Sequence, residues 1–388
     1  MDRIINIGIT INFDTKFFSN GLQQNVIFLN DLINQIESFR CFYLWEGSQI
    51  NKKIVDEKFC FPYKRILQED SIDFDLIIMM GFTFGDNVVK EIKEKNKNTK
   101  IVLMQCGNQF VENMNFSLFD IDKNYSPLGI IDNLDQIWIL PHYEKNISYM
   151  KTYYKNVNTI IVPYIWDSFF IDLLLENSIY KNNKFEFYDL NNKGISIMEP
   201  NLQSSKNCIL PLFIVESFEQ EFPNLLKSCN VFCADKLAEN DYFIKLIIQM
   251  DIYKKKKDFL KVQKRITFLD AITKFGSIII SHQQDNALNY LYLESLYLNL
   301  PILHNSDFIK DYGYYYPEND IDIAKVQINK ILKEHKENIS NYFLNSRKVI
   351  NKFSPKNPDN INEIGQAKIV KTKNDRGQAP QKDPNLCE

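Results

Sequence analysis

The sequence is poor in glycine and histidine. Only 12 of the 388 residues are glycine, about 3% of the chain against an average of about 7%. We expect the glycines that remain to mark turns that need a positive φ angle or a close approach of the backbone to a ligand. There are 4 histidines and 7 cysteines, and no two cysteines are spaced as C-x-x-C. This disfavours a structural zinc site and is typical of free thiols in a reducing compartment.

Long apolar runs and an excess of basic charge are also missing. No apolar stretch reaches about 18 residues, so we expect no membrane span. The first residues run directly into a strand-like pattern, which predicts no signal peptide and a soluble, cytoplasmic protein. The 46 Lys and Arg residues against 49 Asp and Glu residues give a net charge of -3. That charge does not favour a protein that coats nucleic acid.

The two common phosphate-binding loops are absent. No G-x-G-x-x-G follows the first expected strand, and no G-x-x-x-x-G-K-[ST] occurs in the chain. These absences argue against a dinucleotide-binding fold and against a P-loop NTPase. The 45% apolar and 24% charged residues are nonetheless ordinary for a globular protein, and the length predicts two domains.

Short apolar runs alternate with helical patterns through both halves of the chain. In the first half, strands are expected at residues 4–11, 40–44, 74–80, 100–105, 136–140 and 159–162. In the second half, strands are expected at residues 194–198, 230–234, 259–262, 277–281 and 301–304. This alternation predicts an α/β fold of two Rossmann-like, doubly wound domains, with a ligand in the cleft between them.

Changes of pattern set the expected boundaries. We place an N-terminal domain at residues 1–165, a linker at 166–193 and a second domain at 194–335. A last helix is expected at 336–353, and the sparse apolar residues after it predict a disordered tail at 354–388. Of the histidines, His142 and His304 are expected near the cleft and His335 at the surface.

Residues 277–306 carry the most informative pattern. A buried strand delivers Ser281 and His282 to its carboxyl end, and a helix expected from Asn286 carries Glu294. These last two residues lie a little over two helical turns apart and would share one face. A carboxylate on so apolar a helix needs hydrogen-bond donors, which the paired hydroxyls of a ribose would supply. An exposed glutamate on the outer face of the helix is the alternative.

This segment resembles GT-B glycosyltransferases, whose second domain carries E-x7-E before a G-x-P strand. Here Asn286-x7-Glu294 precedes N-L-P at residues 299–301. The resemblance implies that Glu294 binds the ribose of a nucleotide-sugar donor, with Asn286 in place of the first glutamate. The His282-x3-Asn286 spacing also resembles plant-type UDP-sugar transferases, in which both residues meet the diphosphate; those enzymes have a glutamate where this chain has Tyr290.

A second segment, EPNLQSSKN at residues 199–207, follows the first strand of the second half and leads into an expected helix. A helix amino terminus with a lysine suits a diphosphate. In GT-B enzymes a Lys or Arg does this after the corresponding strand, and Lys206 matches by position; a solvated surface lysine is the alternative. The chain looks closest to an uncharacterised GT-B-like family with E-P-N and H-Q-x-x-N-x-L-N-Y stretches. That likeness adds three expected donor-binding residues: Asn201, Asn289 and Tyr290.

In the first half, the resemblance implies an acceptor domain, and the helix at 336–353 would cross back to it. Gly194 is expected beside the shared ligand, together with four residues of cleft loops: Asn20, Gly21, Gly107 and Asn108. An inverting transfer also needs a base, for which Asp14 and Glu199 are the candidates. No metal site or resident cofactor is expected, because the UDP- or GDP-linked sugar is a co-substrate.

The expected reaction transfers a sugar to an unidentified acceptor hydroxyl on a glycan, a lipid-linked sugar, a protein or a modified DNA base. The net charge disfavours DNA. The alternatives are a nucleotide-sugar 2-epimerase, which needs no acceptor, and a non-catalytic nucleotide- or glycan-binding protein. A GT-A transferase with a metal-binding D-x-D at 120–122 or 320–322 is less favoured, because neither motif follows a clear buried strand.

Overall fold

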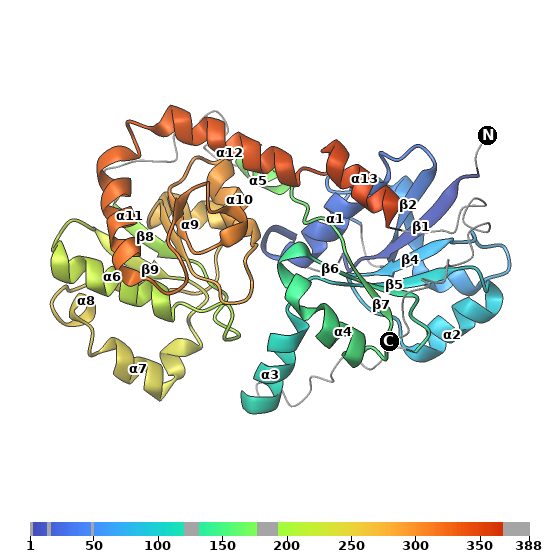
Figure 1. Ribbon diagram of the computed structural model, residues 1–388, viewed down its shortest axis with the longest axis horizontal. Helices are drawn as coiled ribbons and strands as arrows, with labels where there is room; N and C mark the ends of the chain where they lie inside the picture. Colours follow the sequence, from blue (N-terminus) through green and yellow to red (C-terminus); the bar gives the residue numbers. More distant parts are fainter. Residues whose placement is uncertain (1–2, 14–16, 48–49, 120–131, 177–192, 368–388) are drawn as a thin grey trace, which may run out of the picture.

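A computed structural model of the protein contains two parallel β-sheets, each flanked by helices, that form two lobes side by side (Figure 1). The residues that the structure describes are 3–13, 17–47, 50–119, 132–176 and 193–367. The prediction of two Rossmann-like, doubly wound α/β domains that face each other across a cleft is confirmed.

The first sheet has seven parallel strands in the order β3-β2-β1-β4-β5-β6-β7. Its strands are β1 (Ile5–Thr10), β2 (Phe39–Trp45), β3 (Cys60–Pro62), β4 (Leu76–Met79), β5 (Lys100–Gln105), β6 (Gln136–Ile139) and β7 (Asn158–Ile161). Its helices are η1 (Phe17–Ser19), α1 (Gly21–Ile33), η2 (Glu57–Phe59), η3 (Tyr63–Leu67), α2 (Asp86–Lys95), α3 (Gln109–Phe119), η4 (Pro141–Asn146) and α4 (Ile147–Tyr153). The central strands are apolar on both faces because helices cover both sides of the sheet.

The second sheet has six parallel strands in the order β10-β9-β8-β11-β12-β13. Its strands are β8 (Gly194–Ile197), β9 (Ser228–Val231), β10 (Leu260–Val262), β11 (Ile278–Ser281), β12 (Ile302–His304) and β13 (Tyr314–Tyr315). Its helices are α6 (Ile209–Glu221), η5 (Leu237–Glu239), α7 (Asp241–Ile247), α8 (Asp251–Lys254), α9 (Phe268–Lys274), α10 (Tyr290–Tyr297) and η6 (Asp307–Ile309).

Helix α11 (Ile321–Glu334) packs on α6 and completes the second lobe. Helix α5 (Phe169–Glu176) stands between the two sheets in the sequence, and α12 (Ile339–Phe353) and α13 (Pro358–Gln366) follow the second lobe. Helix α12 packs on α10 and runs toward the first lobe, where α13 packs on α1 (Figure 1). The backbone N–H of Trp166 donates to the carbonyl of Phe353 at 2.8 Å, and Gln35 Nε2 donates to the carbonyl of Pro355 at 2.9 Å. The last helices therefore tie the second sheet to the first.

The disordered tail expected from residue 354 is wrong for residues 354–367, which include α13. Asn357 caps this helix by accepting from the N–H of Asp359, and Pro358 occupies its first turn. Ile364 is fully buried, and Asn360 Nδ2 donates to the carbonyls of Lys352 and Ser354. Few apolar residues are thus enough, because they share one helix face. Residues 368–388 lie outside the described residues, as do 177–192 of the expected linker.

Two further expectations are corrected. Gly194 starts β8, at the amino end of the sheet, and so does not lie beside a ligand at the carboxyl ends. A Cβ there would collide with the carbonyl of Phe275 and lie 3.0 Å from Cα of Gly276, so this glycine permits two backbones to approach. His335 is fully buried rather than at the surface, with its ring between the hydroxyl of Tyr314 and the carbonyl of Asn299.

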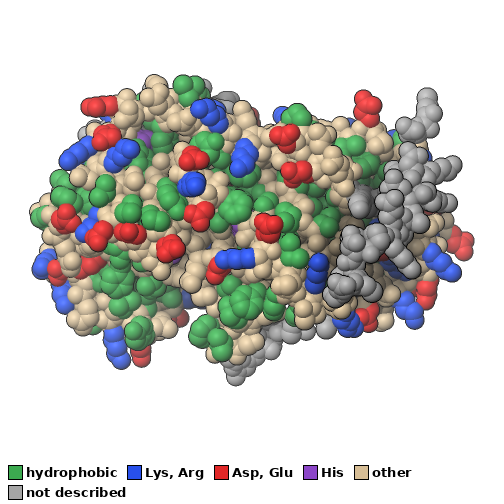
Figure 2. Space-filling model, in the orientation of Figure 1, with side chains coloured by type: hydrophobic (Ala, Val, Ile, Leu, Met, Phe, Trp, Pro, Cys, Tyr) green, Lys and Arg blue, Asp and Glu red, His purple; other side chains and the backbone are tan. Residues whose placement is uncertain are grey.

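On the face seen in Figure 2, Lys and Arg side chains are interspersed with Asp and Glu, as the near balance of charges predicts. Within the described ranges, no helix has both the length and the apolar character to cross a membrane.

Candidate functional site

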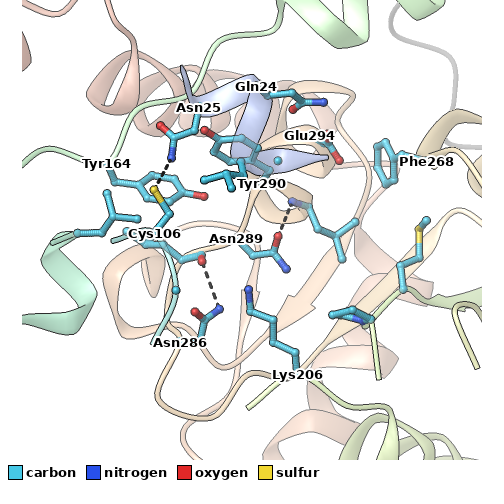
Figure 3. Close-up of a pocket in the computed structure, with 18 of the residues that line it drawn as sticks. Gln24, Asn25, Cys106, Tyr164, Lys206, Phe268, Asn286, Asn289, Tyr290 and Glu294 are labelled. Carbon is cyan, nitrogen blue, oxygen red and sulfur yellow. Dashed lines mark hydrogen bonds between the residues drawn. The ribbon is translucent and has the colours of Figure 1, made fainter. Parts of the chain in front are cut away.

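A cavity of about 440 Å³ lies where the carboxyl ends of the two sheets face each other. The first lobe lines it with α1 and the loops after β5 and β6, and the second lobe with the loops after β8, β9, β10 and β11. This is the place at which doubly wound α/β sheets bind ligands, because their loops converge there. Figure 3 shows a close-up of this pocket.

Glu294 enters the cavity from α10, a helix that is otherwise largely apolar. This helix begins at Tyr290 rather than at Asn286, because Asn289 caps it: Asn289 Oδ1 accepts from the N–H of Leu291 at 3.2 Å. Asn286 and Glu294 therefore do not share a helix face, although both line the cavity.

The Glu294 carboxylate has no hydrogen-bond or ion-pair partner among the residues that the structure describes. Burial raises its pKa to about 7. A carboxylate so placed stabilises a ligand that brings hydroxyl or N–H donors.

Lys206 supplies positive charge to the cavity, and its ammonium group points toward Asn289 (Figure 3). It lies between Glu199 of the second lobe and Glu112 of the first, and both carboxylates act to raise its pKa. Burial has the larger effect and lowers the pKa of Lys206. Within the described part of the chain, no carboxylate lies within 4.0 Å of its ammonium group. An anionic ligand would therefore meet a cation that no described carboxylate neutralises.

The loop that carries Lys206 is held by backbone pairing rather than by a helix end. The N–H of Lys206 donates to the carbonyl of Gln203, and the N–H of Gln284 donates to the carbonyl of Ser205. Helix α6 begins at Ile209, three residues after Lys206.

Asn201 serves the same loop and does not line the cavity. It has a left-handed φ of 55°, its Nδ2 donates to the carbonyls of Glu199 and Phe232, and its Oδ1 accepts from the N–H of Cys208.

Asn286 lines the cavity, but its amide is engaged within the protein. Its Oδ1 accepts from the hydroxyl of Tyr143 in the first lobe, and its Nδ2 donates to Gln283 Oε1 and, at 3.5 Å, to the carbonyl of Leu288. Tyr290 also lines the cavity, and its hydroxyl donates to the carbonyl of Ile165 at 3.0 Å. The side chains of both residues thus join the two lobes.

Two expected site residues lie behind the cavity wall. His282 is buried, its Nδ1 is 3.0 Å from the hydroxyl of Tyr316, and burial lowers its pKa to about 4. Glu199 is fully buried and accepts from Ser281 Oγ and Gln283 Nε2. Burial raises the pKa of Glu199 to about 7, although these donors and Lys206 act to lower it. Neither residue is placed to touch a ligand in the cavity.

Of the residues expected in cleft loops of the first lobe, two line the cavity and two have other roles. Gly21 and Gly107 line the cavity, whereas Asn20 caps α1 and Asn108 bridges the lobes by donating from Nδ2 to the carbonyl of Asp285 at 2.8 Å. Asp14 lies outside the described residues.

Only one of the two D-x-D motifs falls within the described residues. Residues 120–122 also lie outside the described ranges, and Asp320 caps α11 by accepting from the N–H of Ile323. In the described residues, no group of three or more His, Cys, Asp or Glu side chains is placed to hold a metal ion.

The sequence patterns missed other residues of the cavity wall, among them Asn25, Arg265 and Phe268. Each belongs to α1 or to the segment after β10, so its position after a strand was the signal that could have found it. His142, expected near the cleft, lines the cavity, and burial lowers its pKa to about 3. His304, with the same expectation, is fully buried and bonds the carbonyl of Tyr312.

The two facing parallel sheets with a cavity at their carboxyl ends define the GT-B class of fold. Solved structures with this likeness include Anabaena Alr3699/HepE in complex with UDP-glucose (10% identity, TM-score 0.53, 94% of this chain and 100% of that chain). The Candida albicans trehalose-6-phosphate phosphatase N-terminal domain is also similar. It has 10% identity and a TM-score of 0.57, over 94% of this chain and 96% of that chain. A point mutant of S. aureus TarM, solved in complex with UDP, matches over 78% of this chain at 12% identity and a TM-score of 0.50.

This chain spans 57% of the TarM chain. At these identities the likeness shows the fold. No curated protein sequence matches the chain closely enough to count as a relative. The chain belongs to the family described as "Protein of unknown function (DUF2827)", whose family model matches residues 6–367.

Proposed function

We propose that this protein is a GT-B glycosyltransferase that transfers a sugar from a UDP- or GDP-linked donor to an acceptor hydroxyl. The observation that carries the proposal is the pairing, in one cavity between two Rossmann-like domains, of a cation and a carboxylate that lack ion-pair partners among the described residues, Lys206 and Glu294. A nucleoside diphosphate complements both groups, because it brings negative charge and a ribose diol. The UDP-glucose bound to HepE and the UDP bound to TarM support the same class of donor.

The two side chains have distinct roles in this proposal. Lys206 stabilises the charge that develops on the departing diphosphate, which is where electrostatic help lowers the barrier. Glu294, once ionised, accepts hydrogen bonds from the ribose hydroxyls and orients the donor. Because Lys206 provides the counter-charge, we expect transfer to continue in the presence of a chelator. The acceptor would reach the sugar from the first lobe, past Gly21 and Gly107.

Calorimetry of the purified protein with UDP, GDP and their common sugar derivatives tests the proposal. We expect one nucleotide to bind at micromolar concentration and Lys206→Met to weaken it at least tenfold, because the diphosphate loses its charge partner. Lys227→Met, at an exposed lysine, is the matched control. If no nucleotide or nucleotide sugar binds the wild-type protein, the proposal is wrong.

Incubation with the donor alone, followed by chromatography, separates transfer from epimerisation. A transferase releases free nucleoside diphosphate only slowly until an acceptor is added, whereas a 2-epimerase changes the donor sugar without an acceptor. Binding without either reaction would instead indicate a non-catalytic nucleotide-binding protein.

A further inference from the structure

A chain of hydrogen bonds runs from the buried carboxylate of Glu199 to the opposite lobe. Glu199 Oε2 accepts from Gln283 Nε2 at 3.3 Å, and Gln283 Oε1 accepts from Asn286 Nδ2. Asn286 Oδ1 in turn accepts from the hydroxyl of Tyr143, which stands on η4 of the first lobe. Each of these side chains is buried. This series of hydrogen bonds therefore links the loop after β8 to η4 across the cleft, beside the cavity that Asn286 and Tyr143 line.

The direction of this chain follows from the charge at its first member. An ionised carboxylate only accepts hydrogen bonds, so Gln283 must turn its NH2 group toward Glu199 and its carbonyl toward Asn286. Asn286 must then give its own NH2 to Gln283, which leaves its carbonyl for the hydroxyl of Tyr143. Reversing either amide would place two acceptors or two donors face to face in a buried environment, which costs the full desolvation of both groups.

We propose that Glu199 is a positioning residue: through Gln283 and Asn286, its carboxylate directs the hydrogen bond to Tyr143 that holds the two lobes closed around the cavity. This proposal deepens the proposed function and rests on it, since closure completes the donor site; the hydrogen bonds themselves join side chains of the protein only. It also accounts for Asn286 by giving its amide a role within the protein instead of on the donor.

Other polar contacts between the lobes cluster around this link. Asn108 Nδ2 donates to the carbonyl of Asp285, Lys145 forms an ion pair with Asp285, and Asn115 Nδ2 donates to Ser204 Oγ at 3.2 Å. The ion pair of Lys145 is exposed, so solvent screens it. The link from Tyr143 to Asn286 is buried, and a buried bond between matched partners contributes more.

The groups around Glu199 set its pKa close to neutral pH. Burial raises the pKa of Glu199 to about 7, and four groups oppose this: Ser281, Lys206, the N–H of His282 and Gln283. The other titratable groups that face it from the neighbouring elements are Cys208, Cys233, Tyr292 and Tyr316. A protonated Glu199 can donate, and the amides of the chain then lose their enforced direction. We therefore expect the link to weaken as the pH falls from 8 to 6.

Hydrogen exchange in the ligand-free protein tests this inference with Glu199→Gln, Tyr143→Phe and the double variant. We expect each single variant to speed exchange at residues 141–146 and 283–288 about tenfold, as for the loss of one buried hydrogen bond. The double variant should exchange no faster than the singles, because both changes break one chain. After correction for the intrinsic pH dependence of exchange, the exchange rate of the wild type should increase below pH 7. The corrected rate of Glu199→Gln should not change with pH.

Glu216→Gln is the matched control. This buried carboxylate of α6 accepts from the N–H groups of Asp251 and Ile252, far from the other lobe. Unchanged exchange at 141–146 in Glu199→Gln, or effects that multiply in the double variant, would overturn the inference. If Glu199→Gln does not fold, Gln283→Met breaks the same chain without touching the buried charge and replaces it in the cycle. Since no ligand is used, failure here and failure of nucleotide binding are separate results.

Discussion

Lys206 and Glu294 reach one cavity from two elements of the second lobe, and no ion pair joins them or neutralises either one within the described residues. Groups of this kind cost the folded state free energy, because each gives up water without gaining a partner. A protein keeps such groups where a ligand supplies the missing partners, so the cost is itself an argument that the cavity binds something.

Replacement of Glu294 by Gln tests the ribose contact. Glutamine keeps the shape of the side chain and removes the charge, so hydrogen bonds from the ribose hydroxyls become weaker by about 1–2 kcal/mol. We expect the dissociation constant of UDP, measured by calorimetry, to rise about tenfold. The constant for 2′,3′-dideoxy-UDP, which lacks both hydroxyls, should not change. Equal losses for the two nucleotides would contradict the ribose role, and Glu239→Gln on the surface provides the control.

The same substitution should stabilise the empty protein at neutral pH. The folded-state pKa of Glu294 is about 7 against an ordinary value of 4.5, so between these values the unfolded chain releases a proton that the folded one retains. The free energy of unfolding of the wild type therefore falls as the pH rises through this window, and Glu294→Gln lacks that fall. We expect the variant to gain about 3 kcal/mol over the wild type between pH 4.5 and pH 8. Urea titrations at both pH values measure this gain, and a constant difference would contradict it.

Single residues were predictable where a simple pattern constrained them. A glutamate on an apolar helix pointed to Glu294, and a lysine after the first strand of the second half pointed to Lys206. The roles of Asn201 and Asn286 were not predictable. Neither the left-handed φ of Asn201 nor the hydrogen bond of Asn286 to the other lobe can be inferred from the spacing of residues in the sequence. The sequence pattern also cannot show that Glu199 faces away from the cavity.

At the scale of elements, strands were easier to predict than helix ends. Every expected strand overlaps an observed one, because strands covered on both faces read as continuous apolar runs. Helix α10 starts four residues later than expected because Asn289, and not a residue near Asn286, caps it. Helix α13 was missed because its apolar contacts, chiefly Ile364, are few and its composition is that of a loop.

Helix α13 makes its main apolar contribution to stability through Ile364. Ile364 is fully buried where α13 packs against α1. We expect Ile364→Ala to lower the free energy of unfolding by about 2–4 kcal/mol, the usual cost of a large-to-small change in a core. Glu363→Ala, at the exposed neighbouring position, should change it by less than about 0.5 kcal/mol. Denaturant titrations of both variants make the comparison, and equal effects would show that α13 does not dock as described.

At the scale of the whole molecule, the sequence predicted two domains but not how they touch. The contacts between the lobes join residues far apart in the chain, such as Asn108 with Asp285 and Asn115 with Ser204. No periodicity connects such positions, since each pair depends on how α12 and the segment before α5 place the two lobes. These contacts lie beside the cavity, so the arrangement of the lobes and the proposed binding of a donor are coupled.

The exposed ion pair of Lys145 and Asp285 allows this arrangement to be tested without altering the cavity, which neither residue lines. Lys145→Glu replaces an attraction with a repulsion, and at such an exposed site the change shifts the balance between closed and open lobes by about 1 kcal/mol, or about fivefold. We expect a larger radius of gyration by small-angle scattering at low salt, and a return toward the wild-type value at high salt, where the repulsion is screened. Lys151→Glu, exposed on α4 of the same lobe, should have no effect. An unchanged radius in Lys145→Glu at low salt would mean that the buried link from Tyr143 to Asn286 and the crossing of α12 are sufficient to keep the lobes closed.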